Sequence, residues 1–194
     1  MITGSVLILL MVFGGVLLLA FLLGVWAIIT YNGLVALREQ VKQAWAQIDV
    51  YLKRRYDLIP NLVETVKGYA KHEAGTLEAV MKARNAAVTA GSDPRALGQA
   101  EGALTGALGR LFAVAEAYPD LKANTNFMQL QSELASTENQ IASFRGSYNS
   151  TATTYNTKVQ SFPTNILAGF FGFPVRELFE VTDPAAREAP AVKF

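Results

Sequence analysis

The 194-residue sequence contains no cysteine and a single histidine, His72. Without cysteine, the chain has no disulfide framework and no lipoprotein anchor. One histidine cannot complete the glutamate and histidine ligand set of a di-iron bundle, and Tyr69 stands where a Glu-x-x-His pair would need its glutamate. A catalytic base would have to serve serine or threonine alone. We therefore interpret His72 as a solvated surface residue and predict no enzyme activity, no metal site and no cofactor.

Charge is also missing from the N-terminal part, because no Asp, Glu, Lys, Arg or His precedes Arg38. The stretch 6–29 is apolar apart from its glycines, and as a helix it would span roughly 36 Å, enough to cross a bilayer with some tilt. The alternative is a secretory signal peptide, which would need a basic start, a shorter apolar core and a small-x-small cleavage site. These features are absent, so we predict an uncleaved transmembrane anchor over residues 1–30.

The basic residues nearest the anchor, Arg38 and Lys42, lie on its C-terminal side. Basic residues are enriched in cytoplasmic loops, so we expect the N-terminus outside and the rest of the chain in the cytoplasm. The net charge of the whole chain is only +1, which argues against nucleic acid as a partner.

Residues 31–162 are dominated by helix formers and lack β-branched alternation, which predicts an all-α domain. Turn signals at Pro60, at 91–94 and at Pro119 divide it into long helices. We predict an antiparallel up-and-down bundle of four long helices, the first continuing from the transmembrane helix. A kinked single helix through Pro60 is the alternative to a turn there. Heptad spacing is clearest in the last helix, at Phe127, Leu130, Leu134, Thr137, Ile141, Phe144, Tyr148, Thr151 and Tyr155.

Buried charges need partners, so the charged residues of the bundle predict ion pairs across helices. We expect glutamates 64, 116 and 138 to pair with arginines 54, 55, 84 or 145. Structural roles in the core or in ion pairs are therefore assigned to Trp45, Asp49, Arg54, Arg55, Glu64, Glu116, Glu138 and Arg145.

The segment 163–181 is too apolar for a solvated tail. Two interpretations stay open: it caps the end of the bundle, or it contacts the lipid interface or a neighbouring subunit. Membrane or subunit contact is assigned to Phe170, Phe171, Phe173 and Phe179, and to Gly14, Gly15 and Gly24 of the anchor. Residues 182–194 are expected to be a disordered tail.

Several motifs occur in a fixed order along the chain. The longest is Lys53-Arg54-Arg55-Tyr56-Asp57-Leu58-Ile59-Pro60-Asn61-Leu62-Val63-Glu64, preceded by Trp45 and Ile48-Asp49-Val50. Later blocks include Glu116-Ala117-Tyr118-Pro119-Asp120-Leu121, Tyr148-Asn149, Tyr155-Asn156, Phe162-Pro163 and Phe171-Gly172-Phe173. Together they resemble the LemA family from Tyr31 to Phe179, with Tyr51 as a departure where the family commonly has Gln.

The resemblance implies a helical bundle anchored in a bacterial inner (cytoplasmic) membrane, in a family that includes magnetosome-membrane relatives. It also implies a membrane protease or envelope protein as a candidate partner. Our prediction is a scaffold that contacts membrane lipid, forms a homo-oligomer through its glycine-bearing span or its helical faces, and organises membrane. The alternative is a regulatory adaptor for a membrane protease or envelope-stress system.

Overall fold

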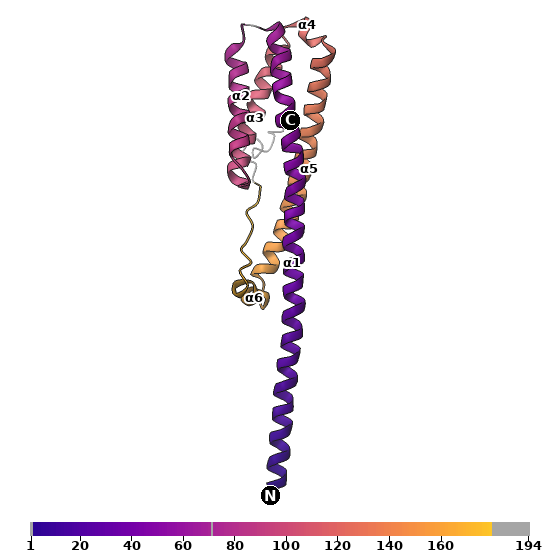
Figure 1. Cartoon of the computed structure of the whole chain (residues 1–194), viewed down its shortest axis with the longest axis vertical. Helices are drawn as coiled ribbons and strands as arrows, with labels where there is room; N and C mark the ends of the chain where they lie inside the picture. Colours follow the sequence, from indigo (N-terminus) through magenta and orange to yellow (C-terminus); the bar gives the residue numbers. More distant parts are fainter. Residues whose placement is uncertain (1, 71, 180–194) are drawn as a thin grey trace, which may run out of the picture. The chain divides into compact units, whose positions relative to one another are not determined.

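The computed structural model describes residues 2–70 and 72–179, which form helices and connecting turns without a β-strand (Figure 1). The helices are α1 (Ile2–Tyr69), α2 (Ala74–Thr89), α3 (Pro94–Ala115), α4 (Pro119–Lys122), α5 (Thr125–Gln160) and α6 (Thr164–Phe170). The prediction of an all-α chain whose N-terminal apolar helix runs on into the bundle is confirmed.

The chain divides into two compact units, and α1 and α5 contribute to both. The first unit comprises Met1–Lys42 and Thr153–Arg176, and the second comprises Gln43–Ala152 and Glu177–Phe194. Each unit is described by itself below.

The second unit is an up-and-down arrangement of α2, α3 and the parts of α1 and α5 that belong to it (Figure 1). Its core is aliphatic and draws on every helix of the unit, with Ile59, Leu62, Val80, Leu104 and Leu111 fully buried. All nine heptad positions predicted on α5, which lie in both units, are buried or half-buried. The 3.5-residue spacing therefore identified the inward face of this helix correctly.

Helix α1 passes through Pro60 without a turn, so the predicted break at this proline is wrong. Proline has no N–H, which leaves the carbonyl oxygen of Tyr56 without its usual partner four residues later. The guanidinium Nε of Arg84, on α2, donates to that oxygen at 3.1 Å. The chain reverses instead between the end of α1 at Tyr69 and the start of α2 at Ala74.

The predicted turn at 91–94 is present between α2 and α3. Gly91 follows the C-cap of α2 and has φ +69°, a backbone conformation that residues with a side chain rarely adopt. Asp93 then caps α3, since its Oδ1 accepts from the backbone N–H of Arg95 (2.9 Å) and of Ala96 (3.2 Å), and Pro94 occupies the first helical position.

The first unit begins with the apolar part of α1, whose side chains from Ile8 to Val25 are all exposed in the isolated chain. Among the described residues, this is the one helix long and apolar enough to cross a membrane, and it fits a single-pass anchor. Above it, the unit has a small core of Leu34, Val41, Tyr155, Val159, Ala168 and Phe173.

The residues after α6 are held along α5 by two Tyr-Asn pairs spaced seven residues apart. In the first unit, Asn156 exchanges two hydrogen bonds with the backbone of Arg176, and the Tyr155 hydroxyl donates to the Pro174 carbonyl. In the second unit, Asn149 exchanges two hydrogen bonds with the backbone of Phe179. The predicted tail at 182–194, with the last two residues of the 163–181 segment, lies outside the described residues.

Candidate functional site

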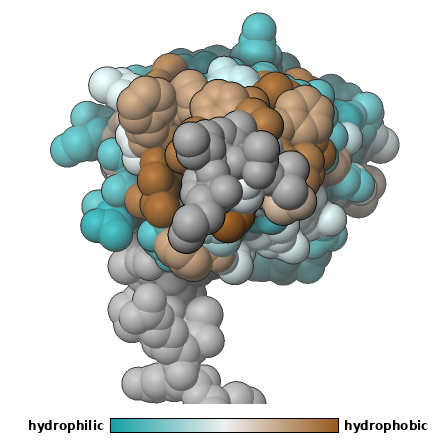
Figure 2. Space-filling model, turned by 90° about the horizontal axis from the view of Figure 1, so that it is seen from below, coloured by the Kyte–Doolittle hydropathy of each residue, from teal (hydrophilic) through white to brown (hydrophobic). Residues whose placement is uncertain are grey.

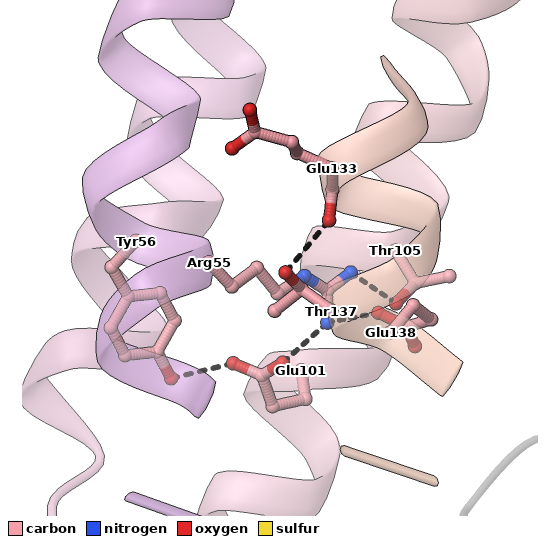
Figure 3. A network of polar contacts seen from close by, with 7 residues as sticks. All are labelled: Arg55, Tyr56, Glu101, Thr105, Glu133, Thr137 and Glu138. Atoms are coloured by element: carbon pink, nitrogen blue, oxygen red, sulfur yellow. Dashed lines mark hydrogen bonds and ion pairs between the residues drawn. The ribbon is translucent and has the colours of Figure 1, made fainter. Parts of the chain in front are cut away.

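A network of buried polar side chains joins three helices of the second unit (Figure 3). Arg55 of α1 is at its centre, with a side chain only 4% exposed. Its Nη1 lies 2.6 Å from Glu101 Oε2 on α3 and 2.8 Å from Glu138 Oε2 on α5. Its Nη2 donates to Thr105 Oγ1 at 2.8 Å. The Arg55 guanidinium therefore ties α1, α3 and α5 together.

Tyr56 completes the coordination of Glu101, because its hydroxyl donates to Glu101 Oε1 at 2.6 Å. Burial raises the pKa of the Tyr56 phenol well above its ordinary value, and the adjacent Glu101 carboxylate raises it further. The phenol consequently stays protonated and acts as a hydrogen-bond donor, not as a base.

A second arginine, Arg145 of α5, adds a positive charge near the same carboxylates. Burial lowers the pKa of its guanidinium, while the charges of Glu138 and Glu101 oppose that shift. The guanidinium carbon lies 4.0 Å from the ring centroid of Phe179, a cation–π contact. Two arginines thus face two glutamates, and the network is close to electrically neutral.

This balance of charge indicates a structural role. Each buried charge has an opposite charge near it, which is what keeps such groups tolerable in a helical core. The described residues contain no cluster of three or more His, Asp or Glu side chains suited to a metal ion. His72 is exposed in the turn between α1 and α2.

The predicted ion-pair residues are placed differently from one another. Arg55 and Glu138 are brought together, as described above. Arg54 lies 3.7 Å from Glu133 at the surface. Glu64 pairs with Lys67 on its own helix and Glu116 with Lys122, both exposed, so the expected pairing of these glutamates with arginines is wrong. Arg84 contacts the Tyr56 carbonyl and Asn85 instead.

The two other residues assigned to the core lie in the second unit. Asp49 is exposed and forms no ion pair with any residue that the structure describes. Trp45 is half-buried, with its ring centroid 5.1 Å from that of Tyr148 and 6.1 Å from that of Phe179.

The residues assigned to membrane or subunit contact fall into two groups. Phe170 and Phe171 are exposed, by 82% and 48%. Phe173 and Phe179 are buried within their own units, so neither is available for an external contact, which corrects their assignment. Gly14, Gly15 and Gly24 lie in the exposed span, where an added Cβ would meet nothing within 4 Å.

Sequence reasoning missed Glu101, the most buried carboxylate of the network. A signal was present, because Glu101 interrupts the apolar stripe formed by Leu97, Leu104, Leu108 and Leu111 on α3. A charged residue within such a stripe needs a buried partner. The roles of Asn149 and Asn156 were also missed, because a side chain that binds distant backbone leaves no periodic pattern.

Comparison with known proteins finds a matching family and several similar sequences. The LemA family model matches residues 44–194. The chain is 29% identical to magnetosome protein MamQ 2 of Paramagnetospirillum magneticum, over 77% of this chain and 64% of the relative. It is 28% identical to magnetosome protein MamQ of Magnetospirillum gryphiswaldense, over the same shares. It is 27% identical to protein LemA of Metamycoplasma hominis, over 71% of this chain and 63% of the relative.

The chain therefore spans less than two thirds of the length of these curated relatives. The family match, in contrast, covers most of the chain, including the three-helix polar network and both Tyr-Asn pairs. With its exposed apolar N-terminal helix, the chain is a membrane-associated helical protein, and it belongs to the LemA family.

Proposed function

We propose that the chain is a membrane-anchored scaffold that self-associates and organises the membrane around it, without a catalytic role. The observation that carries the proposal is the apolar run from Ile8 to Ile29, which is followed along the same helix by a polar bundle. Such a run is stable in hydrocarbon and costly in water. The magnetosome proteins among its relatives support a role in membrane organisation.

Self-association is supported by the surface of the span. Gly14 and Gly15 face open space, so the backbone of a second span could approach them closely. Small residues favour this approach within a bilayer, where van der Waals packing between helices drives association. Gly24 offers a further site nearer the end of the span.

The test is the mass of the full-length protein in mild detergent, by light scattering. A Gly14→Leu, Gly15→Leu double variant should shift an assembly towards monomer, because the new side chains keep two spans apart. Ala20→Leu is the matched control, since at about 100° per residue it lies away from both glycines. A monomeric parent protein, or a double variant that stays assembled like the control, would count against association through this face.

A regulatory adaptor is the second candidate, and one feature of the second unit favours it. The end of α1 and the start of α2 form an open groove, which is lined by the apolar side chains of Val63, Leu77 and Met81 and by the charged side chains of Glu64, Lys67 and Glu78. A partner helix with an apolar stripe would fit such a groove. A protein that is monomeric alone, and forms a complex only when a membrane protease or envelope protein is added, would favour the adaptor.

We also propose an inner-membrane location with the N-terminus outside, on the basis of the basic residues after the span. Single cysteines at Gly4 and Gln40 would test it in whole cells. A membrane-impermeant maleimide should label the first and not the second. The reverse pattern would place the bundle outside.

A further inference from the structure

We propose that α6 is a second membrane contact, whose outward apolar face enters the lipid interface beside the transmembrane helix. The proposal rests on the anchoring of α1 in a bilayer, but not on self-association. All of the residues that carry it belong to the first unit.

The two sides of α6, and of the two residues before it, differ in the exposure of their side chains. Thr164 and Ala168, four residues apart, are buried. Phe162, Ile166 and Phe170, also four apart, are 81%, 64% and 82% exposed. Within α6, Ile166 and Phe170 are four apart and so share one helical face. Phe162 precedes the helix and adds a third exposed side chain to this outward apolar row. Such a row is unfavourable in water.

The position of this row relative to the span follows from ring contacts. The Tyr31 ring lies 4.9 Å from that of Phe171 and 5.7 Å from that of Phe173, centroid to centroid. Tyr31 is only two residues beyond Ile29, the last residue of the apolar run. At 1.5 Å per residue this is roughly 3 Å, within the interfacial layer of about 5–8 Å on each side of the hydrocarbon core.

Burial along α1 agrees with this placement. Trp26 and Ala27 are half-buried, whereas the residues from Ile8 to Val25 are exposed. Figure 1 shows α6 beside α1, and Figure 2 shows apolar residues gathered in the middle of the face seen from below. Tyr and Trp at the end of a span are typical of the membrane–water interface, where one end of the ring is apolar and the other is polar.

The geometry of the helix end fixes which aromatic rings turn outward. Gly172 has φ +70°, and the Phe173 N–H donates to the Ala168 carbonyl at 2.9 Å. This closing turn sends Phe173 into the core of the unit and leaves Phe170 on the outside. The outward row is thus built by the fold and does not result from an unfolded end.

The charge of the first unit favours an anionic lipid surface. Its charged side chains are Arg38, Lys42, Lys158 and Arg176, with Glu39 as the one carboxylate. The Nε of Arg38 lies 3.6 Å from Glu39 Oε1, and Lys42 Nζ lies 2.8 Å from the same oxygen, so this single carboxylate is shared by two of the four basic side chains. Arg38 stacks on the Phe173 ring, 5.2 Å from its centroid. Basic groups beside an apolar wedge are suited to lipid headgroup phosphates.

Because these 194 residues contain no cysteine, a single introduced cysteine gives a direct measurement of depth. A single Gly169→Cys probe would sit next to the outward row, where an added Cβ meets nothing within 4 Å. The labelled protein is reconstituted in phosphatidylcholine–phosphatidylglycerol vesicles. Its fluorescence is quenched by nitroxide lipids, which carry either a shallow label for position 169 or a deep label for position 18, or by acrylamide in the water. Leu18→Cys serves as the membrane control and Gln40→Cys as the aqueous control.

The proposal expects the probe at 169 to lose most of its fluorescence to the nitroxide lipids and little to acrylamide. Adding Ile166→Ser and Phe170→Ser should reverse this pattern while the helical circular dichroism stays unchanged. Quenching at 169 by acrylamide to the extent seen at 40 would overturn the proposal and leave the anchor intact. Protection from both quenchers would also overturn it, since protein would then cover the row. A probe at 18 that nitroxide lipids do not reach would overturn the anchor and this proposal together.

Discussion

The Nε of Arg84 donates to the carbonyl oxygen of Tyr56 at 3.1 Å, and this is the oxygen that Pro60 leaves without a partner. The two residues are 28 positions apart, on α2 and α1. The proline is therefore tolerated inside a 68-residue helix because a side chain of the neighbouring helix replaces the missing backbone donor.

Arg84→Ala should lower the free energy of unfolding by about 1–3 kcal/mol, because it leaves a half-buried carbonyl without a donor. In a Pro60→Ala background the same change should cost less, since residue 60 then supplies an N–H. The double-mutant cycle, measured by urea unfolding in mild detergent, isolates this coupling. Arg95→Ala is the control for removing an exposed arginine. Equal costs in the two backgrounds would disprove the compensation.

The polar network predicts an asymmetry between two adjacent arginines. Arg55→Met leaves the buried Glu101 carboxylate without its cation and should cost about 3–5 kcal/mol. Arg54→Met removes a surface pair and should cost no more than about 1 kcal/mol. Thermal unfolding of both variants followed by circular dichroism gives the comparison.

A companion variant tests the reason for this cost. Arg55→Met combined with Glu101→Met removes the uncompensated charge along with its partner, so part of the lost stability should return. If the double variant is less stable than Arg55→Met alone, Glu101 has a role that does not depend on Arg55.

The sequence was sufficient for the helical architecture because the relevant information is local or periodic. The uncharged N-terminal run, the turn at 91–94 and the heptad positions of α5 all follow from composition or spacing. Pro60 was misjudged because its compensating donor, Arg84, lies far away in sequence. No local pattern could reveal that contact.

The candidate sites were less predictable for the same reason. Phe170 and Phe173 lie in the same apolar stretch of sequence. The turn at Gly172 nevertheless leaves Phe170 exposed and buries Phe173. Phe179 is buried because Asn149 holds its backbone, which composition cannot show. The charged residues of the bundle likewise predicted ion pairs, but they did not indicate which carboxylate would be buried.

The raised pKa of the Asp49 carboxyl predicts that the stability of the protein depends on pH. Asp49 is exposed, but partial desolvation raises the pKa of its carboxyl above the ordinary value of about 3.9, against the opposing effect of a hydrogen bond from Trp45. The native state therefore binds this proton more tightly than the unfolded chain does. Ionising it therefore penalises the native state. The penalty is absent below the unfolded pKa, grows as pH rises through the folded pKa, and is complete at neutral pH.

Asp49→Asn should accordingly raise the Tm at pH 7, and the gain should shrink as the pH is lowered towards about 4. The exposed Asp57→Asn, eight residues along the same helix, is the control for losing a negative charge. A gain at Asp49 that stays constant across this pH range would mean that partial desolvation of the carboxyl is not its cause.

Asn149 tests how the residues after α6 are fixed in the second unit. Its Nδ2 donates to the Phe179 carbonyl at 3.0 Å, and its Oδ1 accepts from the Phe179 N–H at 2.8 Å. Asn149→Ala should therefore cost about 1–3 kcal/mol and release the Phe179 ring from Trp45. Release of Phe179 should shift the emission of Trp45 to longer wavelength, measured in a Trp26→Phe background.

The physical reason for this expectation is that a primary amide matches a peptide group in both directions, which no other side chain except glutamine does. Asn149→Asp keeps the acceptor but points a carboxylate at the Phe179 carbonyl, so it should be no more stable than Asn149→Ala. Gln131→Ala, an exposed position on the same helix, controls for the loss of an amide. An aspartate variant as stable as the parent chain would show that the backbone of Phe179 is held by its ring contacts with Trp45 and Arg145, and not by Asn149.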